Sequence, residues 1–272
     1  MAATHTALSG ILDCGLPYAA LGDGDRDLVI FDAVRVSNRP LQGLHLQGAR
    51  DAYEDYLDHR RIHIIERRPE MPIDYDVTDM VADYEKGVPE LVGLPVDLLG
   101  IGGGGLMALR YAARNPGHVR TLTLLSTAHC MSDEGRERTS RWIAWAEDLR
   151  WRRVHAAFMR SMFPSPLAGA VFGGIAFLAP EAVGTTDYPW DFIIGHRAVM
   201  EAECAADALE VRAPTLIITG ERDLFFPSEL AEETASMIAG SKLSIYPREG
   251  HGLVKSRKKA LREEILSFVE EG

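Results

Sequence analysis

The sequence contains few cysteines, few basic residues relative to acidic ones and no long hydrophobic run. Its three cysteines, Cys14, Cys130 and Cys204, are widely spaced among 272 residues. This spacing argues against a disulfide framework and is typical of a reducing compartment. The net charge of −11 argues against nucleic acid or an anionic membrane as the main partner, because both attract basic surfaces.

Other kinds of segment and site are also absent from the sequence. No stretch approaches the ~18 consecutive apolar residues that a membrane span needs. The opening residues show no basic region followed by an apolar one, so we expect no signal peptide and a cytoplasmic protein. Histidines, cysteines and carboxylates show no metal-ligand spacing. We therefore expect neither a metal nor a cofactor.

The length and composition predict one large α/β domain. Hydrophobic residues make up 46% of the chain and charged residues 25%, as in soluble globular proteins. Short apolar segments alternate with helical ones, which predicts a mostly parallel central sheet flanked by helices. We expect strands at 28–31, 62–65, 96–99, 121–125, 215–219 and 242–245, and helices at 76–92, 106–114 and 260–269.

Residues 129–207 interrupt this alternation with a mixture of tryptophans, arginines and prolines. We predict that this stretch is a helical lid or cap over a core formed by residues 1–128 and 208–272. An aromatic-rich lid favours a small hydrophobic substrate over a polymer. Its apolar surface would equally suit a homodimer, and the sequence leaves the oligomeric state open.

A run of four glycines, 102–105, lies between an apolar segment and a helix-forming one. This layout is typical of a nucleophile elbow, Gly-x-Ser-x-Gly, in which a sharp strand-to-helix turn raises the nucleophile above the sheet. Gly102 stands where the serine belongs. The turn also exposes backbone N–H groups at a helix N-terminus, and Gly103 would donate one to developing negative charge.

An aspartate and a histidine follow in the order that a catalytic triad needs. Residues 217–223 read Ile-Ile-Thr-Gly-Glu-Arg-Asp, a strand followed by an acid. Residues 246–252 read Tyr-Pro-Arg-Glu-Gly-His-Gly, with His251 in a glycine-flanked loop. Nucleophile position, Asp223 and His251 thus occur in the chain order of α/β-hydrolases.

With these three segments in place, the chain resembles the α/β-hydrolase superfamily, in particular its branch of lidded esterases and haloperoxidases. The resemblance extends from Leu16 to Phe268 and is weakest in 129–207. It implies the α/β-hydrolase fold, with the helical lid inserted after the sixth strand. It also implies that Asp223 orients His251.

Two departures from the family pattern bear on function. The first is Gly102, which has no side chain to attack a substrate. The second follows the early strand, where the family has His-Gly and this chain has Asp32 and Ala33. The backbone N–H of Val34 would complete the oxyanion hole. A carboxylate at Asp32 would oppose the negative charge of ester hydrolysis unless Arg35 neutralises it.

The same glycines allow another interpretation, a dinucleotide-binding fingerprint. Gly100, Gly102 and Gly105 match Gly-x-Gly-x-x-Gly, but no acidic residue stands in 126–129, about 20 positions on, where that motif needs one. We therefore favour the elbow.

The substrate pocket is less clearly marked. Cys130 or Ser126 could replace the nucleophile, although a buried structural role is the simpler interpretation. Candidate pocket residues are Asp32, Arg35, Ile101, Ser126, Trp142, Trp145 and Trp190.

Three functional hypotheses remain. The first is a repurposed enzyme in which His251 and Asp223 act as an acid–base pair on a small hydrophobic substrate, in lyase, cyclase, isomerase or oxygenase-type chemistry. The second is a serine ester or lactone hydrolase inactivated by Ser→Gly at position 102. The third is a non-catalytic ligand-binding or signalling protein. The altered loop at Asp32 and the retained His251 favour the first.

Overall fold

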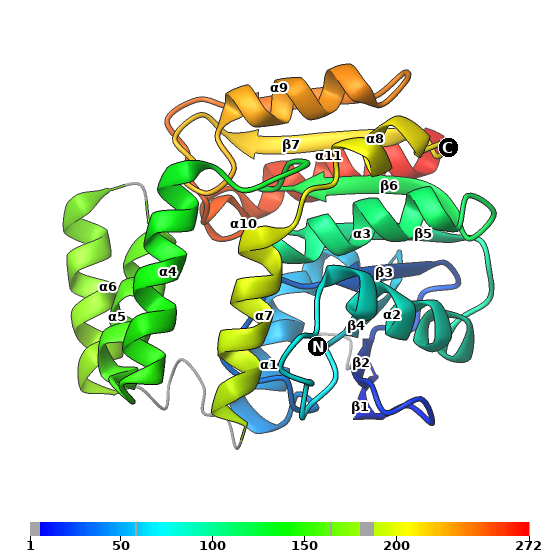
Figure 1. Cartoon of the computed structure of the whole chain (residues 1–272). Coiled ribbons are helices and arrows are strands. Elements are labelled where there is room, and N and C mark those ends of the chain that lie inside the picture. Colours follow the sequence, from blue (N-terminus) through cyan, green and yellow to red (C-terminus); the bar gives the residue numbers. More distant parts are fainter. Residues whose placement is uncertain (1–5, 58, 164, 180–187, 272) are drawn as a thin grey trace.

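The chain folds around one eight-stranded sheet flanked by helices (Figure 1). The computed structural model describes residues 6–271 except 58, 164 and 180–187. The strand order is β1-β2-β4-β3-β5-β6-β7-β8. The strands are β1 (Ala7–Ile11), β2 (Pro17–Leu21), β3 (Asp27–Phe31), β4 (Arg61–Ile65), β5 (Val96–Ile101), β6 (Val119–Leu125), β7 (Thr215–Gly220) and β8 (Lys242–Tyr246).

All pairs from β4 to β8 are parallel, whereas β1 and β2 add an antiparallel edge. The mostly parallel sheet predicted from the sequence is confirmed. The central strands are apolar on both faces, as expected where helices cover both sides. Along β3, for example, Val29 and Phe31 belong to one core cluster, while Leu28 and Ile30 belong to the other.

Two sets of helices bury these faces. One face packs against α2 (Val77–Leu91), α3 (Gly103–Arg114), α8 (Ala205–Glu210) and α9 (Ser228–Met237). The other packs against α1 (Gly43–Tyr53), the short α10 (Leu253–Ser256) and α11 (Lys258–Glu271). Because β5, β7 and β8 run parallel, their carboxyl ends lie at the same edge of the sheet. The glycine run, Asp223 and His251 lie in the segments that follow these three strands.

A helical insertion fills the chain between β6 and β7. It consists of α4 (Asp133–Glu147), α5 (Trp151–Ser161), α6 (Pro166–Leu178) and α7 (Pro189–Glu201), followed by α8. Figure 1 shows α4, α5 and α6 side by side, standing away from the sheet, with α7 between them and the core. No helix of the described part of the chain is both long and apolar enough to cross a membrane.

The side chain of Asp191 fixes α7 to the core. It is 2% exposed and accepts hydrogen bonds from Asn38 Nδ2 at 2.7 Å, the Glu70 amide at 2.9 Å and the Met71 amide at 2.8 Å. A buried carboxylate is stable only when such partners replace its water. The insertion is thus held at a defined position above the sheet edge.

Candidate active site

The turn at Gly102 has the strained geometry of an elbow. Gly102 lies between β5 and α3 with φ 52° and ψ −124°, a left-handed conformation that side chains disfavour. Its N–H donates to the Leu125 carbonyl at 3.0 Å, and its own carbonyl accepts from Gly105 at 2.9 Å. These bonds hold the turn against the end of β6.

Gly104 and Gly105 are required for a different reason: other parts of the chain pack too closely against them to leave room for a side chain. A Cβ at Gly104 would lie 2.1 Å from the Phe31 carbonyl oxygen, and one at Gly105 would lie 2.2 Å from Thr127 Cγ2. A Cβ at Gly102 would meet nothing nearer than His251 Nε2, at 3.4 Å. Position 102 therefore has room for a side chain that would point at the histidine.

Asp223 and His251 form a hydrogen-bonded pair. His251 Nδ1 lies 2.8 Å from Asp223 Oδ2, and the other carboxylate oxygen accepts from the amides of Phe225 at 2.9 Å and Phe226 at 3.1 Å. Asp223 is 1% exposed, so these bonds replace its hydration. With Nδ1–H donating to the carboxylate, Nε2 keeps its lone pair and faces the space above Gly102.

Gly103 and Val34 border the same space. Gly103 begins α3, and a Cβ there would lie 3.1 Å from Val34 Cγ2. Gly103, Val34 and His251 line one small pocket. Because α3 begins at this point, its free N–H groups favour negative charge. The structure thus brings together Gly103 and Val34, the two residues whose amides the sequence assigns to an oxyanion hole.

The loop at Asp32 forms a charged cluster outside this pocket. Asp32 Oδ1 accepts from the Ala33 amide at 2.8 Å, and Asp32 Oδ2 lies 3.4 Å from Arg35 Nε. Arg35 also pairs with the buried Glu66. Arg67 donates to the Arg35 carbonyl at 2.8 Å, and burial lowers the pKa of Arg67 to about 10. Asp32 and Arg35 are thus engaged with each other and line neither pocket of the site.

Two neighbouring spaces lie beside the elbow and His251. The inner pocket has a volume of about 40 Å³ and mostly apolar walls, among them Ala33, Val199 and Phe225. The outer cavity has a volume of about 970 Å³ and lies under α4, α5 and α6. Trp142 and His251 line both. A ligand in the outer cavity can therefore reach the histidine.

His196, on α7, is a wall residue of the inner pocket that the sequence gave no reason to select. Its Nδ1 lies 2.9 Å from the Phe192 carbonyl oxygen, so Nδ1 carries the proton and Nε2 is an acceptor. Burial lowers the pKa of His196 to about 3. The inner pocket thus contains a second imidazole, which is neutral at physiological pH. Only the arrival of α7 beside α3 brings it there, and no motif in the sequence marks that contact.

The other predicted pocket residues do not lie together, and only one of them lines the outer cavity. Trp145 lines the outer cavity. Ile101 lies instead beside a small cavity under α11, on the opposite face of the sheet. Ser126 is buried at φ 50° and lines neither space. Trp190 is 61% exposed and also lines neither. Side chains alternate across a sheet, which explains why Ile101 turns away from its neighbour Gly102.

The surroundings of Cys130 disfavour it as a substitute for the missing serine nucleophile. Burial raises the pKa of the Cys130 thiol, which disfavours the reactive thiolate. Its neighbour His129 is hydrogen-bonded to Thr234, with His129 Nδ1 3.0 Å from Thr234 Oγ1. Neither residue lines the two spaces. Within the described residues, no group of three or more histidines, cysteines or carboxylates has a metal-binding arrangement.

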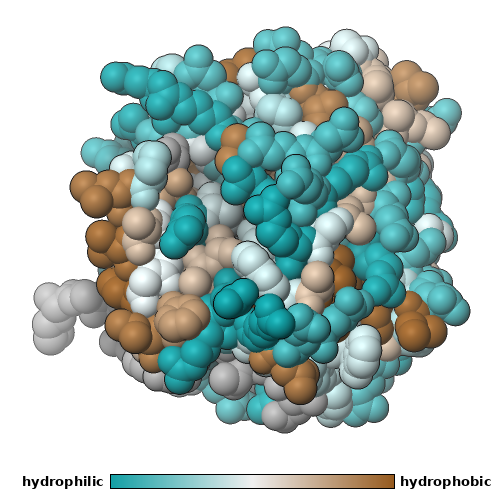
Figure 2. Space-filling view, turned by 60° about the vertical axis from the view of Figure 1, so that its left-hand side comes forward, coloured by the Kyte–Doolittle hydropathy of each residue, from teal (hydrophilic) through white to brown (hydrophobic). Residues whose placement is uncertain are grey.

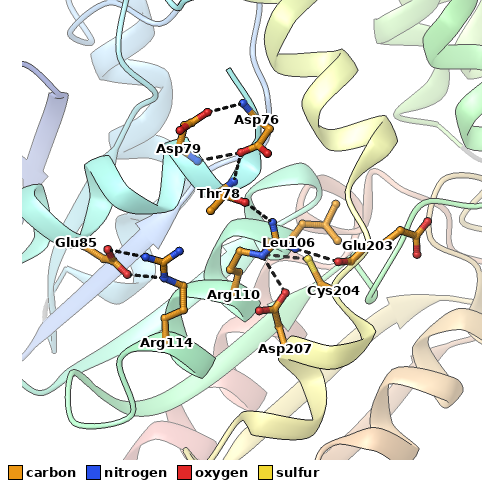
Figure 3. A network of polar contacts seen from close by, with 10 residues as sticks. All are labelled: Asp76, Thr78, Asp79, Glu85, Leu106, Arg110, Arg114, Glu203, Cys204 and Asp207. Atoms are coloured by element: carbon orange, nitrogen blue, oxygen red, sulfur yellow. Dashed lines mark hydrogen bonds and ion pairs between the residues drawn. The ribbon is translucent and has the colours of Figure 1, made fainter. Parts of the chain in front are cut away.

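A polar network behind the elbow fixes α3 (Figure 3). Arg110 on α3 donates to Asp207 at 2.9 Å, to Thr78 Oγ1 at 3.1 Å and to the Glu203 carbonyl at 2.9 Å. Its partners come from α2, from α8 and from the end of the insertion. The helix that carries Gly103 at its N-terminus is thereby tied to both neighbours.

Comparison with known proteins agrees with this architecture. The sequence is 28% identical over 211 residues to a pimeloyl-[acyl-carrier protein] methyl ester esterase from Neisseria meningitidis, covering 71% of this chain and 76% of that one. The enol-lactonase from Burkholderia xenovorans LB400 superimposes with a TM-score of 0.78 at 16% identity, covering 97% of this chain and 100% of that chain. The bromoperoxidase from Bacillus anthracis gives a TM-score of 0.77 at 17% identity, with coverage of 97% and 100%.

The family model agrees with these structural likenesses. Residues 17–264 match the model of the alpha/beta hydrolase family. This confirms the fold class and the resemblance inferred from the glycine run, the aspartate and the histidine. The chain belongs to the alpha/beta hydrolase family.

Proposed function

We propose that this protein is an enzyme in which His251, oriented by Asp223, moves a proton to or from a small hydrophobic substrate without forming an acyl-enzyme. The observation that carries the proposal is the intact 2.8 Å bond between His251 and Asp223, combined with a glycine below Nε2. A base is positioned there, but no nucleophile stands beside it. Enolisation, elimination and isomerisation need only the base.

The proposed step is proton abstraction next to a carbonyl. His251 Nε2 removes a proton from carbon, and the electron pair of that C–H bond moves toward the carbonyl, leaving negative charge on oxygen. Gly103 and Val34 line the pocket in which that oxygen would lie, and their amides would stabilise an enolate as they would a tetrahedral intermediate. Return of the proton to a different atom completes an isomerisation.

The walls of the inner pocket support a small reacting group. About 40 Å³ holds few atoms, so the remainder of the substrate extends past Trp142 into the outer cavity. His196 offers one acceptor, Nε2, to a hydroxyl or N–H of the substrate. Because its pKa is about 3, it stays neutral at physiological pH and does not compete with His251 as the base.

A second candidate function is ester or lactone hydrolysis by a form with serine at position 102. The space at Gly102 favours it, because a Cβ would make only ordinary contacts of 3.4 Å and 3.5 Å. The names of the relatives, a methyl ester esterase and an enol-lactonase, also point to this chemistry. The loop after β3 weighs against it, because Asp32 and Ala33 stand there in place of the family's His-Gly.

Solvent-deuterium exchange tests the proposal. Phenylacetone has an activated C–H beside a carbonyl, and its exchange in D₂O can be followed by proton NMR. General-base catalysis contributes ~10²–10⁴-fold, so we expect His251→Ala to slow the protein-dependent exchange by at least ~100-fold. His45→Ala, at an exposed site on α1, is the matched control and keeps the rate.

Two results would overturn the proposal. If the protein exchanges neither this ketone nor 4-oxo-5-phenylpentanoate, its analogue with a carboxylate, faster than buffer, it lacks the proposed base catalysis, and a binding or signalling role is supported instead. If His251→Ala exchanges as fast as the unmodified protein, the base lies elsewhere. Circular dichroism of both variants establishes that each is folded.

A further inference from the structure

The outer cavity is lined by arginines and by no carboxylate of the described chain. This distribution contrasts with the net charge of −11. In Figure 2, the face of the insertion shows a hollow bordered by hydrophilic side chains, with hydrophobic ones gathered along one edge. The five arginines of the lining are Arg138, Arg141, Arg153, Arg160 and Arg222.

These arginines divide into paired and unpaired groups. Arg138 pairs with Glu134 at 2.7 Å and Arg141 with Glu137 at 2.6 Å, both along α4. The guanidinium groups of Arg153, Arg160 and Arg222 have no ion pair or hydrogen bond to any described residue. Three exposed arginines from α5 and from the loop after β7 thus line one space and have no partner among the described residues.

Apolar walls connect these charges to the active site. Trp145 and Phe163 line the same cavity, and Trp142 and His251 belong to both the cavity and the inner pocket. A volume of about 970 Å³ is at the upper end of sites that hold a small organic ligand. A ligand with an anionic end and an apolar body would match both kinds of wall.

We propose that the outer cavity binds an anionic group of the substrate, a carboxylate or a phosphate, at Arg153, Arg160 and Arg222. This proposal rests on the proposed function and narrows its substrate to an amphiphilic anion. Guanidinium groups bind carboxylate and phosphate oxygens through paired N–H donors. The apolar body of the ligand would then lie along Trp145 and Trp142, with its reacting end in the inner pocket beside His251.

Calorimetric titration with three eight-carbon probes tests this proposal: octanoate, octyl phosphate and octanol. We expect at least one anion to bind tenfold or more tightly than the alcohol, with affinity that falls as salt increases. The anion that binds more tightly identifies carboxylate or phosphate as the preferred group. The triple variant Arg153→Gln, Arg160→Gln, Arg222→Gln should lose at least tenfold in affinity for it.

The control variant removes the same number of positive charges from arginines that do not line the cavity. Arg150, Arg197 and Arg212 lie outside the cavity lining, and changing all three to glutamine should leave anion binding within twofold. Equal binding of octanol and both anions, or full affinity in the first triple variant, would overturn the proposal. Anion binding is measured without turnover, so it does not depend on proton transfer by His251. Failure of ketone exchange with intact anion binding would therefore refute the proposed chemistry but not this site.

Discussion

Replacing single glycines of the elbow tests the geometry on which the site depends. In Gly104→Ala, the new Cβ would lie 2.1 Å from the Phe31 carbonyl oxygen and 2.5 Å from that of Asp32. Both are backbone atoms and cannot rotate away, so α3 must move by about 1 Å to restore ordinary contact. Overpacking of this kind costs ~1–3 kcal/mol or more. We expect the free energy of unfolding to fall by at least ~3 kcal/mol.

Gly102→Ala is the matched comparison. Its Cβ would lie 3.4 Å from His251 Nε2 and 3.5 Å from Ala33 Cβ, so it clashes with nothing. Only the positive φ of 52° opposes the methyl group, at a cost of ~1–2 kcal/mol. Urea denaturation followed by circular dichroism measures both variants. If Gly104→Ala is no less stable than Gly102→Ala, α3 does not approach β3 as closely as the structure shows, and the assignment of the elbow fails.

Three further predictions concern the charges around the site. Gly102→Ser should leave 4-nitrophenyl acetate hydrolysis within ~10-fold and fluorophosphonate labelling absent, because Asp32 and Ala33 stand where the family has the His-Gly of its oxyanion loop; a gain above ~10³-fold with labelling would support the esterase alternative. Asp191→Ala removes the acceptor of three hydrogen bonds, two of them buried, and should cost ~3 kcal/mol or more in urea denaturation; a loss below ~1 kcal/mol contradicts the anchoring of α7. His196 has a folded pKa of about 3 against an ordinary 6.5, so the unfolded chain binds its proton first and stability falls as pH drops from about 6.5 toward about 3. His196→Asn should flatten that slope by up to ~1.4 kcal/mol per pH unit, and an unchanged slope would refute the burial of a neutral imidazole.

Most of the central sheet could be predicted from the sequence. The buried strands are continuous apolar segments, and the helices between them have regular apolar spacing, so their positions differ from prediction by only a few residues. The edge strands β1 and β2 and helix α1 were missed. Half-exposed residues form β1, and α1 carries no side-chain cap. Such segments take their structure from pairing and packing, which local sequence does not encode.

The candidate site, like the fold, could be predicted from the sequence only in part. Gly102, Asp223 and His251 could be selected because an elbow, an acid and a loop histidine leave local signatures at the ends of strands. His196 and the arginines of the outer cavity left none, since their positions depend on how the insertion packs. Trp190 was chosen for its residue type alone, and it lies at the surface.

The proposed chemistry depends on His251 and Asp223 acting as one acid–base unit, and Asp223→Asn tests this most directly. Asparagine keeps the size of the side chain but presents an amide, which favours the tautomer with the proton on Nε2. Loss of the carboxylate in a comparable triad lowers turnover by ~10⁴-fold. We predict that Asp223→Asn slows His251-dependent deuterium exchange of phenylacetone by at least ~100-fold while the protein remains folded. Exchange at the unmodified rate would contradict the account.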